Sequence, residues 1–392
     1  MASGLFFPGA TSRYDFIAID WRGVGESGQI QCDITEPDAA FRTLPLRPGP
    51  GAERQAYAEL FARYQSSCED GYGGALFANM GTEQAARDMD RVREALGEEK
   101  ISYLGISYGG YLGAVYATLF PDRVHAFVLD SPASPTPDVL TDLESWATRI
   151  EPFYDAFFTA CGGDAGCAFH GGEGASAVAL AYETLMAELE ASGGLTVGSR
   201  TLTRSDAGKA LYGRMLSQNV NVIASELADL EAGDGTALLA DADGWYAGSS
   251  PDLMDVQVIF CLDRSANSIG TDPFWDGLAA LESGAAPHVA YDIANYWGMC
   301  RDWPVVRPPT PVAAATAPPL LVITGDTDMW APRPYAEATV DALGNGSHLL
   351  VGDHFGHGQT TFTTPSMCAP NTADAFFEDP TVAPTVTDCG AM

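Results

Sequence analysis

A serine flanked by glycines, in the sequence Gly105-Ile106-Ser107-Tyr108-Gly109, lies between two segments of different character. Residues 100–106 before it are β-prone, and residues 108–120 after it are typical of a helix built from small side chains. Such a pentapeptide also occurs in ordinary turns, but strand, turn and helix together predict a nucleophile elbow, in which glycines let the neighbouring chain pass closely. Ser107 is therefore the predicted nucleophile, and the Tyr108 amide at the helix start is a predicted oxyanion donor.

The carboxylate of a catalytic triad has two sources in this sequence. Residues 14–20 form an apolar run, expected to be a parallel strand, that ends in Asp20 and a glycine-rich turn. Asp20 precedes the serine, whereas α/β-hydrolases order their triad as serine, acid, histidine, so we expect Asp20 to have a structural role. A later buried-type strand, residues 318–328, ends in acidic residues. Asp328 is the predicted acid, and Asp326 is the alternative.

The base follows one further predicted strand, residues 347–353, which leads to His354 and His357. We prefer His357 because glycines flank it and let a loop fold back over the serine. Like the serine and the acid, it follows the carboxyl end of a strand, where open α/β sheets place their sites. Such a histidine takes the serine proton as the serine attacks a carbonyl carbon, and the acid fixes the imidazole. The predicted reaction is acyl transfer to water, and these residues do not distinguish esters from amides.

Charge and composition exclude several classes of partner. The net charge is −32, with lysine only at positions 100 and 209, so the surface is expected to repel nucleic acid and anionic membranes. No apolar run approaches the ~20 residues of a membrane span, and the first residues lack the features of a signal peptide. We predict no cofactor, no metal, no nucleic-acid partner and no membrane span, and the sequence does not predict the oligomeric state.

The eight cysteines fall into neighbouring pairs along the chain. An even count fits disulfides, while buried free thiols and a zinc site are the alternatives; no Cys-x-x-Cys pair has a matching second pair. The four pairs are Cys32 with Cys68, Cys161 with Cys167, Cys261 with Cys300, and Cys368 with Cys389.

The middle of the chain differs from both ends. Between Asp130 and Pro318 amphipathic helices dominate, for example at 176–190 and 222–232, with glycine-rich connectors. We predict an α/β core in residues 1–135 and 311–392, with a helical cap inserted at 136–310. Ahead of the elbow, a helix is predicted to be capped by Thr82 and stopped by Gly97, with Ala85, Met89, Val92 and Leu96 on its buried face.

The quoted stretches, together with Asp20-Trp-Arg-Gly-Val-Gly-Glu-Ser27, Cys300-Arg-Asp-Trp-Pro304 and the tail at 356–389, resemble the secreted tripeptidyl aminopeptidase branch of the prolyl-aminopeptidase-like serine peptidases. The resemblance covers nearly the whole chain. It implies an α/β-hydrolase fold with a mostly parallel central sheet, flanking helices and an inserted cap. It also implies an exopeptidase that releases tripeptides or single residues from free peptide N-termini, with Ser107, Asp328 and His357 in the triad positions. Finally, it favours disulfides at all four cysteine pairs, and hence an extracellular or periplasmic protein.

One departure concerns the oxyanion hole. Members of this family carry a His-Gly-Gly-Pro-Gly type loop after an early strand, whereas only thirteen residues precede Tyr14 here. The first strands and half of the oxyanion hole are therefore expected to be missing, and losing one donor costs about 10²- to 10³-fold in rate. An inactive fragment is thus one alternative to the peptidase, and an esterase or lipase-like enzyme is another. A peptidase would also need carboxylates to bind the substrate amine, for which Asp142, Glu144 and Glu151 are candidates.

Overall fold

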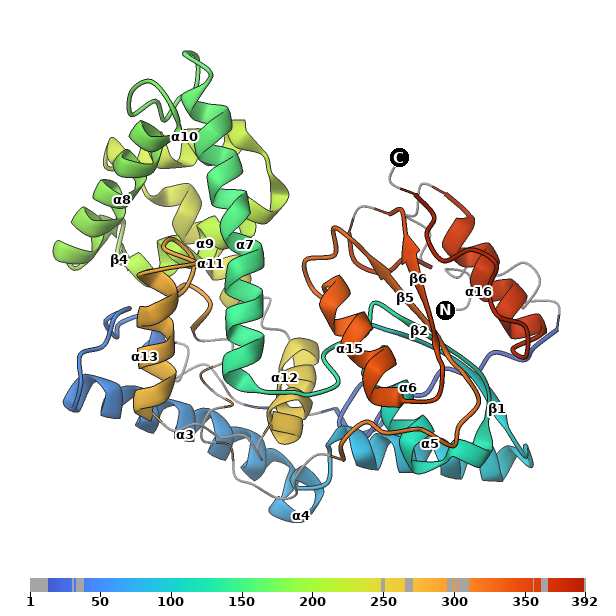
Figure 1. Ribbon diagram of the computed structural model, residues 1–392. Helices are drawn as coiled ribbons and strands as arrows, with labels where there is room; N and C mark the ends of the chain where they lie inside the picture. The colour runs from blue at the N-terminus through green and yellow to red at the C-terminus, as the bar shows by residue number, and fades with distance from the viewer. Residues whose placement is uncertain are drawn as a thin grey trace. The chain divides into compact units, whose positions relative to one another are not determined.

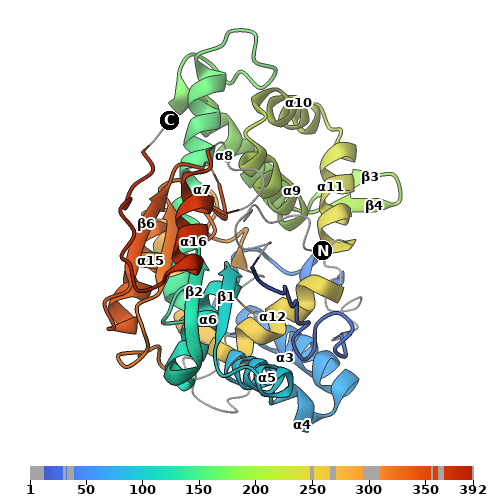
Figure 2. The ribbon, with the colours of Figure 1, turned by 90° about the vertical axis from the view of Figure 1, so that its right-hand side faces the viewer.

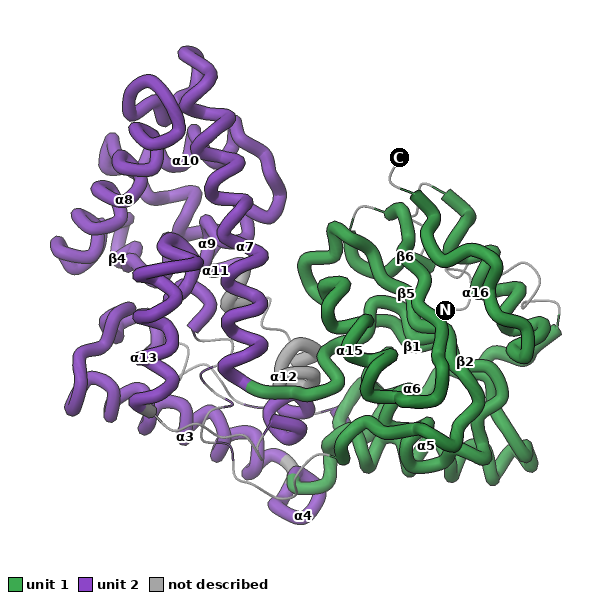
Figure 3. Tube along the Cα trace, viewed as in Figure 1, with its two compact units in different colours: residues 1–28, 78–138, 307–392 green, residues 29–77, 139–306 purple. Residues whose placement is uncertain are grey.

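The computed structural model describes residues 13–29, 32, 39–247, 251–264, 271–294, 298, 300, 303, 310–354, 356–360 and 366–390. The chain divides into two compact units (Figure 3). Unit 1 contains residues 1–28, 78–138 and 307–392, and unit 2 contains residues 29–77 and 139–306.

Unit 1 is an α/β structure around a parallel sheet (Figure 1). Its described elements are α5 (Thr82–Leu96), β1 (Ile101–Ile106), α6 (Tyr108–Leu119), the 3₁₀ helix η2 (Pro121–Arg123), β2 (Val124–Asp130), β5 (Leu321–Gly325), α15 (Arg333–Leu343), β6 (His348–Gly352) and α16 (Cys368–Glu378). The described strands form a four-stranded sheet in the order β1-β2-β5-β6. One row of the sheet runs through Ile106, Asp130, Ile323 and Leu350, so the strands end close to the same edge.

Helices cover both faces of this sheet (Figures 1 and 2). On one face, Ala126 and Val128 of β2 join a buried apolar cluster with Phe376 and Phe377 of α16. On the other face, the ring of Phe127 lies 5.5 Å from that of Tyr116 in α6. Because adjacent residues of a strand point to opposite faces, the nearly continuous apolar sequence of β2 fits a strand buried on both sides.

The strands predicted at 100–106, 318–328 and 347–353 are confirmed as β1, β5 and β6, and the elbow helix is confirmed as α6. The strand predicted at 14–20 is wrong. That segment has no strand pairing, and Phe16 and Ile17 are exposed. Instead it is anchored to α16, because the Tyr14 hydroxyl donates to the carbonyl of Phe377 at 2.6 Å. An apolar pattern indicates burial, but a strand also needs a neighbouring strand to which it is hydrogen-bonded. Residues 14–20 are not paired with any described strand, and β1 is the edge of the described sheet.

The helix predicted at 82–97 is confirmed as α5, with two corrections. Gly81, not Thr82, is the N-cap, and the Thr82 hydroxyl contacts the Tyr108 hydroxyl instead. Leu96 is exposed, whereas Arg93 is buried and its guanidinium binds Asp90 at 2.7 Å. Gly97 ends the helix in a left-handed conformation (φ 77°), as expected for a glycine C-cap.

Unit 2 is mainly helical. Its described elements are α3 (Ala52–Tyr72), α4 (Gly74–Phe77), α7 (Val139–Gly162), α8 (Ala175–Ala191), β3 (Leu195–Val197), β4 (Arg200–Leu202), α9 (Arg204–Ser217), α10 (Val220–Glu231), α11 (Thr236–Ala247), α12 (Pro251–Arg264) and α13 (Thr271–Glu282). The helices predicted at 176–190 and 222–232 are confirmed as α8 and α10. The aromatic side chains of α7 pack inside this unit, where the Tyr154 ring lies 5.9 Å from that of Tyr182 in α8.

The predicted assignment of all of residues 1–135 to the core was wrong for residues 29–77, which belong to unit 2. In this unit α3 packs on α13: the ring of Tyr57 lies 4.7 Å from that of Trp275, and Arg54 binds Asp272 at 3.0 Å. The partner of α3 lies some two hundred residues further along the chain, which no local pattern shows. That unit 2 acts as a cap stays a prediction.

Disulfides join all four predicted cysteine pairs: Cys32–Cys68, Cys161–Cys167, Cys261–Cys300 and Cys368–Cys389. The last of these ties the C-terminal tail to the start of α16. The tail also runs beside β6, where the Cys389 amide donates to the carbonyl of Val351 at 2.8 Å. No described helix is both long enough and apolar enough to cross a membrane.

Candidate active site

Ser107 occupies the bend between β1 and α6. Its backbone is strained, with φ 60° and ψ −121°, a conformation that costs a non-glycine residue about 1–3 kcal/mol. Hydrogen bonds hold it there: the Ser107 amide donates to the carbonyl of Asp130 at 2.9 Å, and its carbonyl accepts from Gly110 (2.9 Å) and Ala133 (3.1 Å). The side chain is partly exposed. The predicted strained turn is therefore present, and it presents a serine at a helix N-terminus.

The two glycines of the pentapeptide are not equivalent. A Cβ atom on Gly105 would lie 2.2 Å from the carbonyl oxygen of Gly109 and 2.6 Å from the ring of Tyr103. A Cβ atom on Gly109 would meet its nearest neighbour, the Tyr103 hydroxyl, at 3.5 Å, which is an ordinary contact. Both glycines were expected to be required by close packing. Only Gly105 is, because the start of α6 crosses directly over it.

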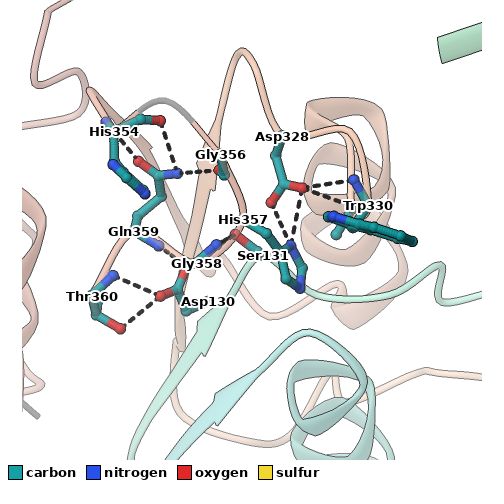
Figure 4. Close-up of polar contacts among 11 residues, drawn as sticks. Asp130, Ser131, Asp328, Trp330, His354, Gly356, His357, Gly358, Gln359 and Thr360 are labelled. Carbon is teal, nitrogen blue, oxygen red and sulfur yellow. Dashed lines mark hydrogen bonds and ion pairs between the residues drawn. The ribbon is translucent and has the colours of Figure 1, made fainter. Parts of the chain in front are cut away.

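An acid that follows β5 and a histidine that follows β6 form a pair (Figure 4). The Nδ1 atom of His357 lies 3.0 and 2.9 Å from the two carboxylate oxygens of Asp328. An ionised carboxylate only accepts, so this contact requires a proton on Nδ1; in the neutral imidazole Nε2 is then the basic nitrogen. The Asp328 side chain is 0% exposed, and the His357 side chain is 25% exposed. The amides of Trp330 and Ala331 also donate to Asp328, each at 2.9 Å.

The alternative residues have other surroundings. Asp326 binds Arg333 at 3.0 Å, and its side chain is 60% exposed. His354 lies at the start of the loop that follows β6 and carries His357. Its backbone amide donates to the side chain of Gln359 at 3.0 Å (Figure 4). The structure therefore brings Asp328 together with His357, as the sequence analysis preferred. Their catalytic role, like that of Ser107, stays a proposal.

The loop that carries His357 is anchored beside the elbow through β2. The amide of Gly358 donates to the hydroxyl of Ser131 at 3.2 Å, and Ser131 follows Asp130, whose carbonyl binds the Ser107 amide. Sequence reasoning missed this anchor. The only local sign in the sequence is Asp130, an acidic residue at the end of a mostly apolar strand. Many residues that merely cap a strand or helix have the same pattern.

The segment that follows Tyr14 supports the elbow from another side. The Asp20 carboxylate accepts from the Glu26 amide at 3.0 Å and closes the turn, which agrees with the structural role expected for it. The ring of Trp21 lies 5.5 Å from that of Tyr108. Since Tyr108 is the first residue of α6, its amide belongs to the helix N-terminus, where no intrahelical acceptor exists. Its role as an oxyanion donor stays a prediction.

Two of the three acids considered for amine binding already have partners within unit 2. The Asp142 carboxylate binds the Arg264 guanidinium at 2.6 Å, and both side chains are buried. Glu151 contacts the ring of His288 and accepts from the amide of the same residue at 3.2 Å. Of the three, Glu144 alone is exposed. Asp142 and Glu151 therefore serve the packing of this unit.

Residues 2–171 match the α/β hydrolase fold family, and residues 287–389 match the TAP-like protein family. These two regions contain the elbow, the acid and the histidine. The chain therefore has the α/β-hydrolase fold. The C-terminal match and the relatives described next are consistent with the tripeptidyl-aminopeptidase-like branch that the sequence motifs resemble.

A tripeptidyl aminopeptidase of Streptomyces lividans is 43% identical over 148 residues, which cover 35% of this chain and 27% of that enzyme. The serine protease Hip1 of Mycobacterium tuberculosis is 32% identical over 347 residues, covering 80% of this chain and 62% of the protease. A carboxylesterase B of the same species is 28% identical over 393 residues, covering 96% of this chain and 73% of that protein. The chain thus spans less than two thirds of the length of the first two relatives.

Proposed function

We propose that this chain is a serine hydrolase that cleaves peptides near a free N-terminus, with Ser107 as nucleophile, His357 as base and Asp328 as acid. The observation that carries this proposal is the pair formed by the buried Asp328 and the partly buried His357, whose loop is anchored beside a strained serine. Backbone strain of this kind persists only where the surrounding structure holds it, and it concentrates at functional sites.

In this mechanism His357 Nε2 removes the hydroxyl proton as Ser107 attacks the substrate carbonyl carbon. The new C–O bond creates a tetrahedral oxyanion, for which the Tyr108 amide at the start of α6 is the proposed donor. Collapse breaks the C–N bond, and the departing amine takes the proton from His357. Water then attacks the acyl-enzyme and gives a proton to His357. Collapse breaks the bond to the Ser107 oxygen, which takes that proton from His357 as the acid product leaves. Asp328 stabilises the imidazolium in both halves of the cycle.

The substrate class rests on the relatives. Two of them are named for peptide hydrolysis, one of those for release of tripeptides, and the family match over residues 287–389 includes the histidine loop. A carboxylesterase name among the relatives supports an ester-hydrolysing enzyme as the second candidate, because the same triad serves both reactions. The four disulfides support an extracellular or periplasmic location, where such bonds persist.

The test compares free and N-acetylated versions of the same short peptide anilide, with a p-nitrophenyl ester as a third substrate. Acetylation removes the amine charge and leaves the scissile bond unchanged. We expect kcat/KM to fall at least about tenfold on acetylation, which corresponds to roughly 1.4 kcal/mol of transition-state binding. Equal hydrolysis of both peptides would contradict the exopeptidase role, and turnover of the ester alone would support the esterase instead.

A further inference from the structure

The carboxylate of Asp130, the last residue of β2, is fully buried and accepts four hydrogen bonds (Figure 4). Its donors are the amides of Gln359 (2.9 Å) and Thr360 (2.8 Å), and the hydroxyls of Thr360 (2.6 Å) and Ser131 (3.1 Å). An ionised carboxylate accepts and does not donate, so its two oxygens match this set of donors. Burial raises the pKa of Asp130, and the hydrogen bonds oppose that rise.

These donors belong to the loop that carries the candidate base. Gly358, Gln359 and Thr360 follow His357 directly, and each of their amides is bonded to the side chain of Asp130 or Ser131. The path of the chain immediately after His357 is therefore fixed by two neighbouring residues at the end of β2.

The same two residues are bonded to the elements that carry the other members of the candidate triad. The Asp130 carbonyl accepts from the amide of Ser107 at 2.9 Å. The Ser131 amide donates at 2.7 Å to the carbonyl of Ile323 in β5, the strand that leads to Asp328. Asp130 and Ser131 thus connect the serine, the acid-bearing strand and the histidine loop through short polar contacts.

The Gln359 side chain closes the loop from within. It accepts from the His354 amide at 3.0 Å and donates to the Gly356 carbonyl at 3.1 Å. It also lies over Gly325 and Gly352, where a Cβ atom would approach it to 2.4 and 2.2 Å. The loop is therefore held at the ends of β5 and β6 as well, and the Asp130 carboxylate is the charged acceptor in this network.

We propose that Asp130 is a positioning residue: its carboxylate holds residues 358–360 so that His357 reaches both Ser107 and Asp328. This inference rests on the proposed function, because it assigns Asp130 a part in the reactivity of Ser107. Asp130 acts through the loop and makes no contact with substrate in this account. The carboxylate is required for its acceptor atoms, so an isosteric amide, which turns an NH₂ group toward donors, does not replace it.

Thr360 gives the mildest test, because Thr360→Val removes one hydrogen bond to Asp130 and keeps the side-chain shape. Thr360→Ser keeps the hydroxyl and is the conservative rescue. Thr324→Val is the matched control: Thr324 is equally buried in β5, and its hydroxyl has no hydrogen-bond partner among the described residues. We expect kcat to fall about tenfold in Thr360→Val, with KM changed less than about threefold, because misplaced catalytic groups reduce turnover. Thr360→Ser and Thr324→Val should keep the unmodified kcat.

Asp130→Asn removes more of the network and should lower kcat by about 10²-fold. Reaction with a fluorophosphonate probe gives a second readout that needs no peptide substrate. Should Asp130→Asn fail to fold, the Thr360 series alone decides. Equal probe rates and equal kcat in Thr360→Val and Thr324→Val would overturn the positioning role while leaving the proposed function intact. An unmodified protein that does not react with the probe would refute the proposed function, and the positioning role with it.

Discussion

Replacing Gly105 by alanine tests the geometry of the elbow, because the added Cβ would lie 2.2 Å from the carbonyl oxygen of Gly109. An ordinary carbon–oxygen contact is ~3.3 Å or longer, so the start of α6 has to retreat by about 1 Å. Gly109→Ala adds the same atom to the same pentapeptide, but its nearest neighbour stands at 3.5 Å. A short motif treats the two glycines alike, whereas the structure predicts opposite outcomes.

The expected magnitudes follow from these contacts. Overpacking of this kind costs about 1–3 kcal/mol of stability, so Gly105→Ala should be destabilised by that amount. The same shift moves Ser107, which follows two residues later, and a misplacement of about 1 Å costs on the order of 10²-fold in rate. Gly109→Ala lies in the first turn of α6, where alanine is favoured over glycine by roughly 0.5–1 kcal/mol. It should therefore keep its stability or gain some.

The assay pairs urea unfolding with the rate of reaction toward a fluorophosphonate probe, each measured for both variants and the unmodified protein. Normalising the rate to the folded fraction separates a displaced serine from a loss of folded protein. If Gly105→Ala reacts as fast as Gly109→Ala and unfolds at the same urea concentration, the close approach of α6 to Gly105 is not what shapes the elbow.

Two further predictions concern charged groups. Asp328→Ala should lower kcat by about 10⁴-fold, as loss of a triad acid does. Asp326→Ala removes only the exposed ion pair with Arg333 and should leave kcat unchanged. A larger loss of kcat in Asp326→Ala than in Asp328→Ala would make Asp326 the triad acid. Burial alone would lower the pKa of His288, but its contacts with Glu151 and Glu183 raise it overall. Its stabilising contribution is therefore complete below the unfolded value of ~6.5 and is lost as pH rises through the higher folded pKa. The stability difference between the protein and His288→Gln should shrink from pH 6 to 9 in urea unfolding, and a constant difference would refute the charged interaction.

The sequence predicted those parts of unit 1 that local pattern determines. An apolar run followed by a glycine-flanked serine identified β1, the bend and α6. Chain order favoured a later acid over Asp20, and flanking glycines favoured His357 over His354. Residues 14–20 were predicted as a strand because their apolar character indicates burial, but pairing depends on a neighbouring strand that the sequence does not reveal.

Contacts between distant segments were beyond sequence reasoning. The placement of α3 with unit 2 depends on Trp275 and Asp272, far along the chain. Asp130 received no site prediction, because three of its four donors belong to residues 359 and 360, which only the fold brings to it. Asp142, one of three candidates for binding a substrate amine, is paired with Arg264, which lies more than a hundred residues further along the chain.

The most direct test of the central claim is peptide mapping after reaction with a fluorophosphonate, because this reagent bonds to a serine only where a base activates it. The account predicts one adduct, on Ser107, at a rate that falls by at least about 10³-fold in His357→Ala. His354→Ala should react as the unmodified protein does. An adduct on another serine, or a rate that depends on His354 and not on His357, would contradict the proposed triad.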